Sequence, residues 1–231
     1  MARIVVLTGA GVSAESGLGT FRDKGGLWSK YDLAEVATPE GFAQNPGLVH
    51  EFYNARRANA VEAAPNDAHH ALARLEAGLG EKLTLITQNI DTLHEAAGST
   101  RVFHMHGRID QALCAACGHR WMAPLVMAPP DPCPDCRTPA TRPDIVWFGE
   151  MPYWMDEITE AVARADLFVS IGTSGEVYPA AGFVAEAKAI GAQTLELNME
   201  ASGRGRLFDT VRLGPATQTV PAWVAEMLGP L

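Results

Sequence analysis

The chain has 231 residues, of which 47% are hydrophobic and 19% charged, and its formal net charge is −9 at pH 7. Such a chain can bury one good core, so disorder is not expected. Its net acidity gives no general attraction to nucleic acid or to an anionic membrane, and we expect neither as a partner. An apolar run begins within a few residues of the start and no run approaches about 18 residues, which favours a cytoplasmic protein.

A glycine-rich turn follows the first predicted strand, Ile4–Thr8. Gly9, Gly11 and Ala14 fit the G-x-G-x-x-G/A pattern, in which the backbone approaches a pyrophosphate at the start of a helix. A glycine turn without a ligand is the alternative. The polar, glycine-interrupted residues 20–28 then replace the usual continuation to an acidic residue about 20 positions later. The segment is typical of a flap and indicates an insertion.

Short strand-like segments recur along the chain with helical patterns between them, which predicts an α/β fold: a Rossmann-like, doubly wound parallel sheet. Two insertions, residues 31–78 and 108–144, are expected to form a smaller domain, the first helical and the second cysteine-rich. Residues 1–30, 79–107 and 145–231 would form the nucleotide-binding domain. The predicted strands are Ile4–Thr8, Leu83–Thr87, Val102–His104, Leu167–Ile171 and residues 194–197 and 211–213, and the predicted insertion helices are Pro46–Glu62 and one from Asn66 or Asp67 to Leu79.

All four cysteines belong to one pattern: Cys114-x-x-Cys117, fifteen intervening residues, then Cys133-x-x-Cys136. Two such pairs place four thiolates around a tetrahedral structural Zn²⁺ with no open position for water. Two disulfides are the alternative, which a reducing compartment disfavours. Because every cysteine is used, a thiol nucleophile is not expected elsewhere.

Polar side chains follow two successive predicted strands, where open α/β sheets bind ligands. Gln88, Asn89 and Asp91 offer amides and a carboxylate suited to a carboxamide and to ribose hydroxyls, although Asp91 equally fits a helix N-cap. His106, after the next strand, can act as a general base near neutral pH. A purely structural histidine is the alternative.

Two later features complete the candidate site. Glu200 follows a predicted strand and can accept hydrogen bonds from two ribose hydroxyls, or it is simply a solvated acid. Tyr53 and Arg56 lie three residues apart on a predicted helix, so that both can approach one carboxylate. A solvated basic edge is the alternative for the arginine.

The motifs together resemble the sirtuins over essentially the whole chain. GAGVSAESGLGTFRD, TQNIDTLH, HMHG, the paired cysteine motifs and VWFGE occur in the order of that family, closest to its bacterial CobB-type and mitochondrial desuccinylase-type branch. The resemblance implies NAD-dependent removal of acyl groups from lysine in proteins or peptides, giving nicotinamide and 2′-O-acyl-ADP-ribose. It implies NAD as co-substrate and one structural Zn²⁺, and we expect a monomer. Alternatives are a mono-ADP-ribosyltransferase, a long-chain or lipoyl deacylase, and a non-catalytic NAD- or ADP-ribose-binding module.

The resemblance also assigns residue roles. Tyr53 and Arg56 would accept an acidic acyl group such as succinyl, whereas Leu33, bulkier than its counterparts in relatives, would narrow the acyl tunnel. We therefore expect both deacetylase and desuccinylase activity. The implied catalytic residues are His106, Asn89 and Asp91, and the implied metal ligands are Cys114, Cys117, Cys133 and Cys136. The implied substrate-binding residues are Tyr53, Arg56, Val146, Phe148, Gly149, Glu150 and Val177. The implied NAD-binding residues are Gly9, Ala10, Gly11, Ser13, Ala14, Glu15, Thr20, Phe21, Arg22, Trp28, Gln88, Asn89, Ile90, Asp91, Gly172, Thr173, Ser174, Asn198, Met199, Glu200 and Ala216.

Overall fold

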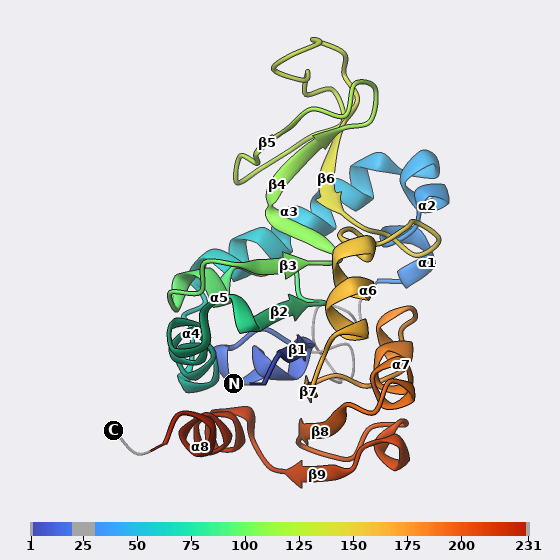
Figure 1. Ribbon diagram of the computed structural model, residues 1–231. Helices are drawn as coiled ribbons and strands as arrows, with labels where there is room; N and C mark the ends of the chain where they lie inside the picture. Colours follow the sequence, from blue (N-terminus) through green and yellow to red (C-terminus); the bar gives the residue numbers. More distant parts are fainter. Residues whose placement is uncertain (1, 20–30, 230–231) are drawn as a thin grey trace.

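The computed structural model describes residues 2–19 and 31–229, and a six-stranded parallel sheet forms its centre (Figure 1). Along the sheet the strands lie in the order β3-β2-β1-β7-β8-β9, and every neighbouring pair is parallel. Numbered by their succession in the chain, they run 3-2-1-4-5-6, the order of a doubly wound dinucleotide-binding fold. The predicted fold class is confirmed. The strands are β1 (Ile4–Thr8), β2 (Leu83–Thr87), β3 (Val102–His104), β7 (Leu167–Ile171), β8 (Gln193–Asn198) and β9 (Thr210–Leu213).

Helices cover both faces of this sheet because its central strands are apolar on both sides. Ile4 and Val6 pack with helices α4 (Asp67–Leu79) and α8 (Ala216–Leu228). Val5 and Leu7, which point to the opposite face, pack with α6 (Met155–Ala163) and α7 (Phe183–Ala189). The alternation along β1 therefore produces two cores, one on each face.

A second, antiparallel sheet of order β5-β4-β6 extends at the top of Figure 1, away from the large sheet. Its strands are β4 (Gly107–Cys114), β5 (Arg120–Met122) and β6 (Thr141–Ile145). Ile109 and Ile145 of this sheet pack with Phe52 and Tyr53 of α3 (Pro46–Glu62), which gives the small sheet its own core.

Capping residues determine where the inserted helices begin. Asn45 accepts a hydrogen bond from the Leu48 amide at the start of α3, with Pro46 in the first turn. Asn66 and His69 form a capping box at the start of α4. The predicted starts of both helices are therefore observed. The remaining short helices are α1 (Leu33–Val36), α2 (Pro39–Gln44) and α5 (Leu93–Ala96).

One local prediction is wrong. The glycine-rich turn does not open a helix within the described residues: Ala10–Val12 and Ala14–Ser16 are two short 3₁₀ turns. Gly17, at φ +84°, ends the second turn in the left-handed region, which interrupts helical continuation.

Helix α4, which we expected in the helical insertion, contributes four side chains to the core of the large sheet: Ala68, Ala71, Leu72 and Leu75. The division of the chain into domains stays a prediction, and we propose counting α4 with the sheet that it covers.

Among the described residues, no helix is both long and apolar enough to cross a membrane.

Candidate functional site

A cleft of about 1150 Å³ opens at the carboxyl ends of β1, β2, β7 and β8 and continues to α3 and the loop after β6. Parallel strands direct the turns that follow them to one edge, which is why residues distant in the chain meet there. Of the predicted site residues that the structure describes, the metal ligands aside, all line this cleft except Glu15. Four predicted NAD-binding residues lie outside the described residues: Thr20, Phe21, Arg22 and Trp28.

The turns after β1 and β7 are in direct backbone contact on the floor of the cleft. The Gly9 amide donates to the Ile171 carbonyl oxygen at 2.9 Å. A Cβ atom on Gly9 would lie 2.8 Å from both the Gly172 oxygen and the Thr173 Cβ. The neighbouring turn leaves no room for a Cβ atom at position 9, so only glycine fits there. The absence of side chains exposes a backbone surface that is suited to a pyrophosphate.

Ser13 joins the two predicted polar residues Asn89 and Asp91. Its hydroxyl donates to Asp91 Oδ2 at 3.0 Å and accepts from Asn89 Nδ2 at 3.0 Å. Burial raises the pKa of the Asp91 carboxyl, while bonds from the Leu93 amide and from Ser13 oppose that shift. Asp91 Oδ1 accepts from the Leu93 amide at 3.1 Å at the start of α5, although the N-cap residue of that helix is Thr92. A role of Asp91 toward a cofactor stays a prediction.

The ring of His106 has a defined tautomer. Its Nδ1 lies 3.0 Å from the Gln88 carbonyl oxygen, which can only accept, so Nδ1 carries the proton and Nε2 the lone pair. Burial lowers the pKa of His106, and the Gln88 bond opposes this shift. The neutral ring is therefore the dominant form at neutral pH, as a general base requires. The Gln88 side chain itself donates to Thr173 Oγ1 at 3.0 Å.

The part of the cleft beside α3 contains Tyr53 and Arg56. Tyr53 is 1% exposed, and burial raises the pKa of its hydroxyl. The Arg56 guanidinium carbon lies 5.8 Å from the Tyr53 ring centroid. Burial lowers the pKa of Arg56, but Tyr53 and Asp91 act in the opposite direction, and an arginine remains charged under such a shift. A phenol and a guanidinium therefore face the same part of the cleft.

The four cysteines fit a zinc ion. Their sulfur atoms all lie within 4.8 Å of one another, with 3.6 Å between Cys114 and Cys136 and 3.8 Å between Cys117 and Cys133. A tetrahedron with Zn–S bonds of about 2.3 Å has sulfur separations of about 3.8 Å. Disulfides would need about 2.0 Å. The predicted tetrathiolate arrangement is therefore present at the end of the small sheet.

Comparison with known proteins decides the family. The model of the Sir2 family matches residues 9–179, most of the chain. The chain belongs to the Sir2 family. An NAD-dependent protein deacylase of Caulobacter vibrioides is 59% identical over 233 residues, covering 99% of this chain and 98% of the relative. One from Escherichia coli K12 is 53% identical over 231 residues, covering 98% of this chain and 82% of the relative.

Solved Sir2 structures share the same fold. A complex of a Sir2 homologue with NAD has a TM-score of 0.89 and 39% identity, covering 98% of this chain and 90% of that one. A Sir2 variant with a deacetylated p53 peptide and 3′-O-acetyl-ADP-ribose has a TM-score of 0.80 and 29% identity, covering 97% and 92%. The predicted membership of the sirtuins is confirmed.

Glu15 is the described member of the predicted NAD set that does not line the Sir2 cleft. Its two carboxylate oxygens accept from Thr217, one from the amide at 3.0 Å and one from the hydroxyl at 2.7 Å. Glu15 thus places a carboxylate beside the N-terminus of α8, where it pairs with an unbonded amide and the positive end of the helix. Its role toward the cofactor stays a prediction.

Sequence reasoning missed Glu196, which supports the loop of the predicted adenosine pocket. This carboxylate is fully buried on β8, and its Oε1 accepts from Asn198 Nδ2 at 3.2 Å and from the Ser202 amide at 2.9 Å. Asn198 also donates to the Thr173 carbonyl oxygen at 2.8 Å. The position of Glu196 between apolar residues of a strand gave no sequence signal.

Sequence reasoning also missed Asn59, which lines the cleft. It lies three residues beyond Arg56 on the same helix, and that spacing was a usable signal.

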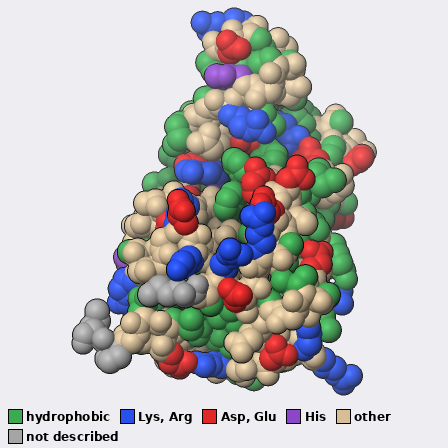
Figure 2. Space-filling view, in the orientation of Figure 1, with side chains coloured by type: hydrophobic (Ala, Val, Ile, Leu, Met, Phe, Trp, Pro, Cys, Tyr) green, Lys and Arg blue, Asp and Glu red, His purple; other side chains and the backbone are tan. Residues whose placement is uncertain are grey.

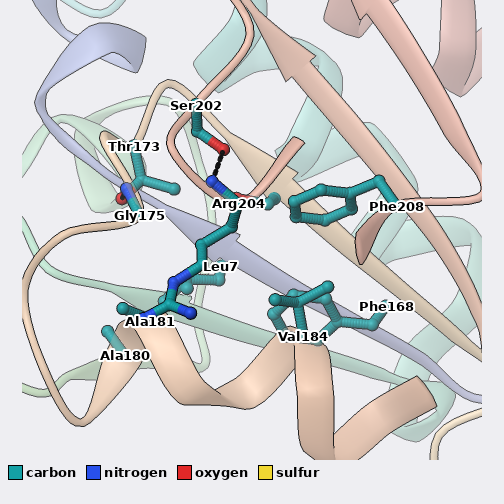
Figure 3. Close-up of a pocket in the computed structure, with 11 residues that line it drawn as sticks. Leu7, Phe168, Thr173, Gly175, Ala180, Ala181, Val184, Ser202, Arg204 and Phe208 are labelled. Atoms are coloured by element: carbon teal, nitrogen blue, oxygen red, sulfur yellow. Dashed lines mark hydrogen bonds between the residues drawn. The ribbon is translucent and has the colours of Figure 1, made fainter. Parts of the chain in front are cut away.

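A second, much smaller cavity lies between β7, α7 and the loop after β8 (Figure 3). Its volume of about 10 Å³ holds at most one water molecule. Leu7, Phe168 and Phe208 line it, and the Arg204 amide donates to Ser202 Oγ at its edge. A space of this size is too small for a ligand larger than water.

Proposed function

We propose that the protein is an NAD-dependent protein acyl-lysine deacylase that removes acetyl groups and also acidic acyl groups such as succinyl. NAD is consumed as a co-substrate: nicotinamide leaves, and the acyl group passes from lysine to ADP-ribose. The observation that carries the proposal is the His106 ring, neutral, with its Nε2 lone pair in the same cleft as the Ser13–Asn89–Asp91 cluster. The named relatives of this Sir2 chain support it.

In this proposal His106 accepts a proton from a ribose hydroxyl through Nε2, because Nδ1 is already committed to Gln88. Asn89 and Asp91 hold the nicotinamide and its ribose, while the turns at Gly9 and Gly172 receive the phosphates. Asn198 and Glu200 belong to the adenosine end. The four cysteines would hold a structural Zn²⁺, and four thiolate ligands would leave no open position for catalysis.

Acyl recognition would use Tyr53 and Arg56. A buried carboxylate on the acyl chain would accept from the phenol and pair with the guanidinium, an arrangement that discriminates far better than an extra methylene. An acetyl group makes neither contact. Changes at these two residues should therefore alter desuccinylation much more than deacetylation.

The peptide carrying the lysine would lie as an added strand between the loop after β6 and residues 175–178. The Val146 amide donates to the His106 carbonyl oxygen at 2.9 Å and the Phe148 amide to the Ala37 carbonyl oxygen at 2.9 Å. Both amides are thus engaged within the protein, and pairing at these two residues would use their carbonyl oxygens. Acidic and basic side chains are interspersed on the face in Figure 2. Recognition through the backbone of the peptide does not require a surface patch of one charge.

The test is to incubate the purified protein with NAD and matched acetyl- and succinyl-lysine peptides, following peptide mass and nicotinamide release. His106→Ala should lose at least about 100-fold in rate with both peptides, a typical cost of losing a general base. His70→Ala, an exposed histidine on α4, is the matched control and should keep full activity.

Arg56→Met should lower desuccinylation about tenfold or more while leaving deacetylation within about twofold. Arg74→Met, at an exposed position on α4, is its control. Full activity of His106→Ala would refute the mechanism. Labelled protein in place of O-acyl-ADP-ribose would instead indicate a mono-ADP-ribosyltransferase, and NAD binding without any product a binding module.

A further inference from the structure

Trp147, in the loop after β6, contacts the part of the cleft beside α3 through one hydrogen bond. Its indole Nε1 donates to the Tyr53 hydroxyl oxygen at 3.1 Å, and both side chains are buried. Both also line the cleft. We propose that Trp147 is a specificity-determining residue that directs the Tyr53 hydroxyl proton toward an acidic acyl group, an inference that rests on the proposed function.

The argument begins with the hydrogen-bonding capacity of a phenol. A tyrosine hydroxyl has one proton to donate and two lone pairs to accept with. Because the indole N–H is a donor only, the bond from Trp147 occupies a lone pair of Tyr53. The Tyr53 proton cannot point at Trp147 and has to rotate away from the indole. Since burial also raises the pKa of Tyr53, the hydroxyl keeps this proton and remains a donor.

Trp147 is itself held on three sides. The Arg142 guanidinium carbon lies 3.5 Å from the centroid of the indole ring, directly against its face. Glu150 Oε2 accepts from the Trp147 backbone amide at 2.8 Å. Phe42 packs nearby at 5.0 Å between ring centroids. These contacts determine where the indole N–H points.

Arg142 and Glu150 also bind each other. Arg142 Nη1 donates to Glu150 Oε1 at 2.7 Å and Nη2 to Oε2 at 2.9 Å, a two-point contact with Arg142 only 11% exposed. Arg142 Nη2 further donates to the Ile145 carbonyl oxygen at 2.8 Å. A planar guanidinium can stack and make a two-point contact at the same time, which lysine cannot. Arg142 is therefore a positioning residue that acts through Trp147.

This arrangement affects acyl groups differently. A succinyl carboxylate would gain a charge-assisted bond from a hydroxyl already oriented as a donor, whereas an acetyl group has no acceptor there. Loss of the Trp147 N–H would free the hydroxyl to rotate. The effect should appear in affinity for acidic acyl-lysine and not in the chemical step that both substrates share.

The test compares wild type, Trp147→Phe, Tyr53→Phe and the double variant by fluorescence anisotropy with labelled succinyl- and acetyl-lysine peptides, and by KM and kcat with NAD. Trp147→Phe keeps an aromatic ring and removes the donor. We expect succinyl-peptide affinity to fall about five- to tenfold, with KM rising equally and kcat and acetyl binding within about twofold. The double variant should be no weaker than Tyr53→Phe alone, because both changes remove one interaction.

Trp121→Phe, on β5 of the small sheet, is the matched control and should leave both peptides unaffected. Thermal unfolding of each variant shows whether it is folded. A second variant, Arg142→Lys, keeps the indole N–H but loses the stacked guanidinium. Arg142→Lys should reproduce part of the loss in affinity for the succinyl peptide. Equal losses for both acyl groups, or additive effects in the double variant, overturn the inference. A wild-type protein that binds succinyl-lysine but turns over neither peptide refutes the proposed function alone.

Discussion

The Gly11 amide donates to the Gly172 carbonyl oxygen at 2.8 Å, which joins the turns that end β1 and β7. Gly172 has φ +61°, and a Cβ atom there would lie 2.6 Å from the Val12 nitrogen and 2.7 Å from the Gly11 carbonyl carbon. Both neighbours are backbone atoms, which cannot move aside as a side-chain end can. The close approach of the two turns thus depends on the absence of a side chain at this position.

Gly172→Ala should therefore displace the turn after β7, which we propose receives a phosphate of NAD. The left-handed conformation alone costs a residue with a Cβ atom about 1–2 kcal/mol, and the overlap adds to it. We expect KM for NAD to rise at least about tenfold, measured by nicotinamide release. Gly191→Ala is a matched control: its φ is +84° but no atom lies within 4 Å of the added Cβ. If both variants lose only stability and keep the wild-type KM, the turn contact has no part in NAD binding.

The pH dependence should report His106. Because burial lowers the pKa of its ring below 6.5, the base form persists at neutral pH and is lost only as the pH falls through that lower value. The acid limb of the deacylation rate should have its midpoint below pH 6.5. NMR titration of the ring signal that disappears in His106→Gln measures the same pKa directly. A midpoint at or above pH 7 would contradict the assignment.

Removing zinc should abolish activity although no cysteine lines the cleft. Arg57 on α3 donates to the Ile109 carbonyl oxygen at 2.8 Å, and Asn54 donates to that of Met127 at 2.9 Å, so α3 is tied to the metal-bearing module. Loss of the metal should loosen this contact and the adjacent Tyr53. We expect one Zn²⁺ per chain by elemental analysis, and a melting temperature lowered by more than about 5 °C after chelation. Full activity with the metal removed would refute this coupling.

Leu33 should restrict the acyl chain. It lines the cleft at the start of α1, where Asp32 caps the helix by accepting from the Ala34 amide. Leu33→Ala leaves that cap intact and enlarges the space, so the ratio of succinyl to acetyl kcat/KM should rise about threefold or more. Glu35→Ala changes an exposed residue of the same helix that does not line the cleft, and it should leave the ratio unaltered.

The strands were predictable because each is a short apolar run bounded by polar or turn residues. Four of the six strands of the large sheet have the expected bounds, and β8 and β9 differ only at their ends, where β8 gains Gln193 and Asn198 and β9 gains Thr210. The inserted helix α4 was predictable in extent but not in location. Its apolar side chains pack on the large sheet, and nothing in its local pattern distinguishes one core from another.

The sequence by itself determined the parallel α/β fold, the tetrathiolate cysteine pattern and the side chains present at each strand end, because these depend on local periodicity and spacing. Only the tertiary structure decided which of these side chains act on one another. The bonds from Trp147 to Tyr53 and from Gly11 to Gly172 join residues far apart in the chain. Such contacts follow from how strands stack and loops fold back, and no local pattern encodes the direction of a hydrogen bond.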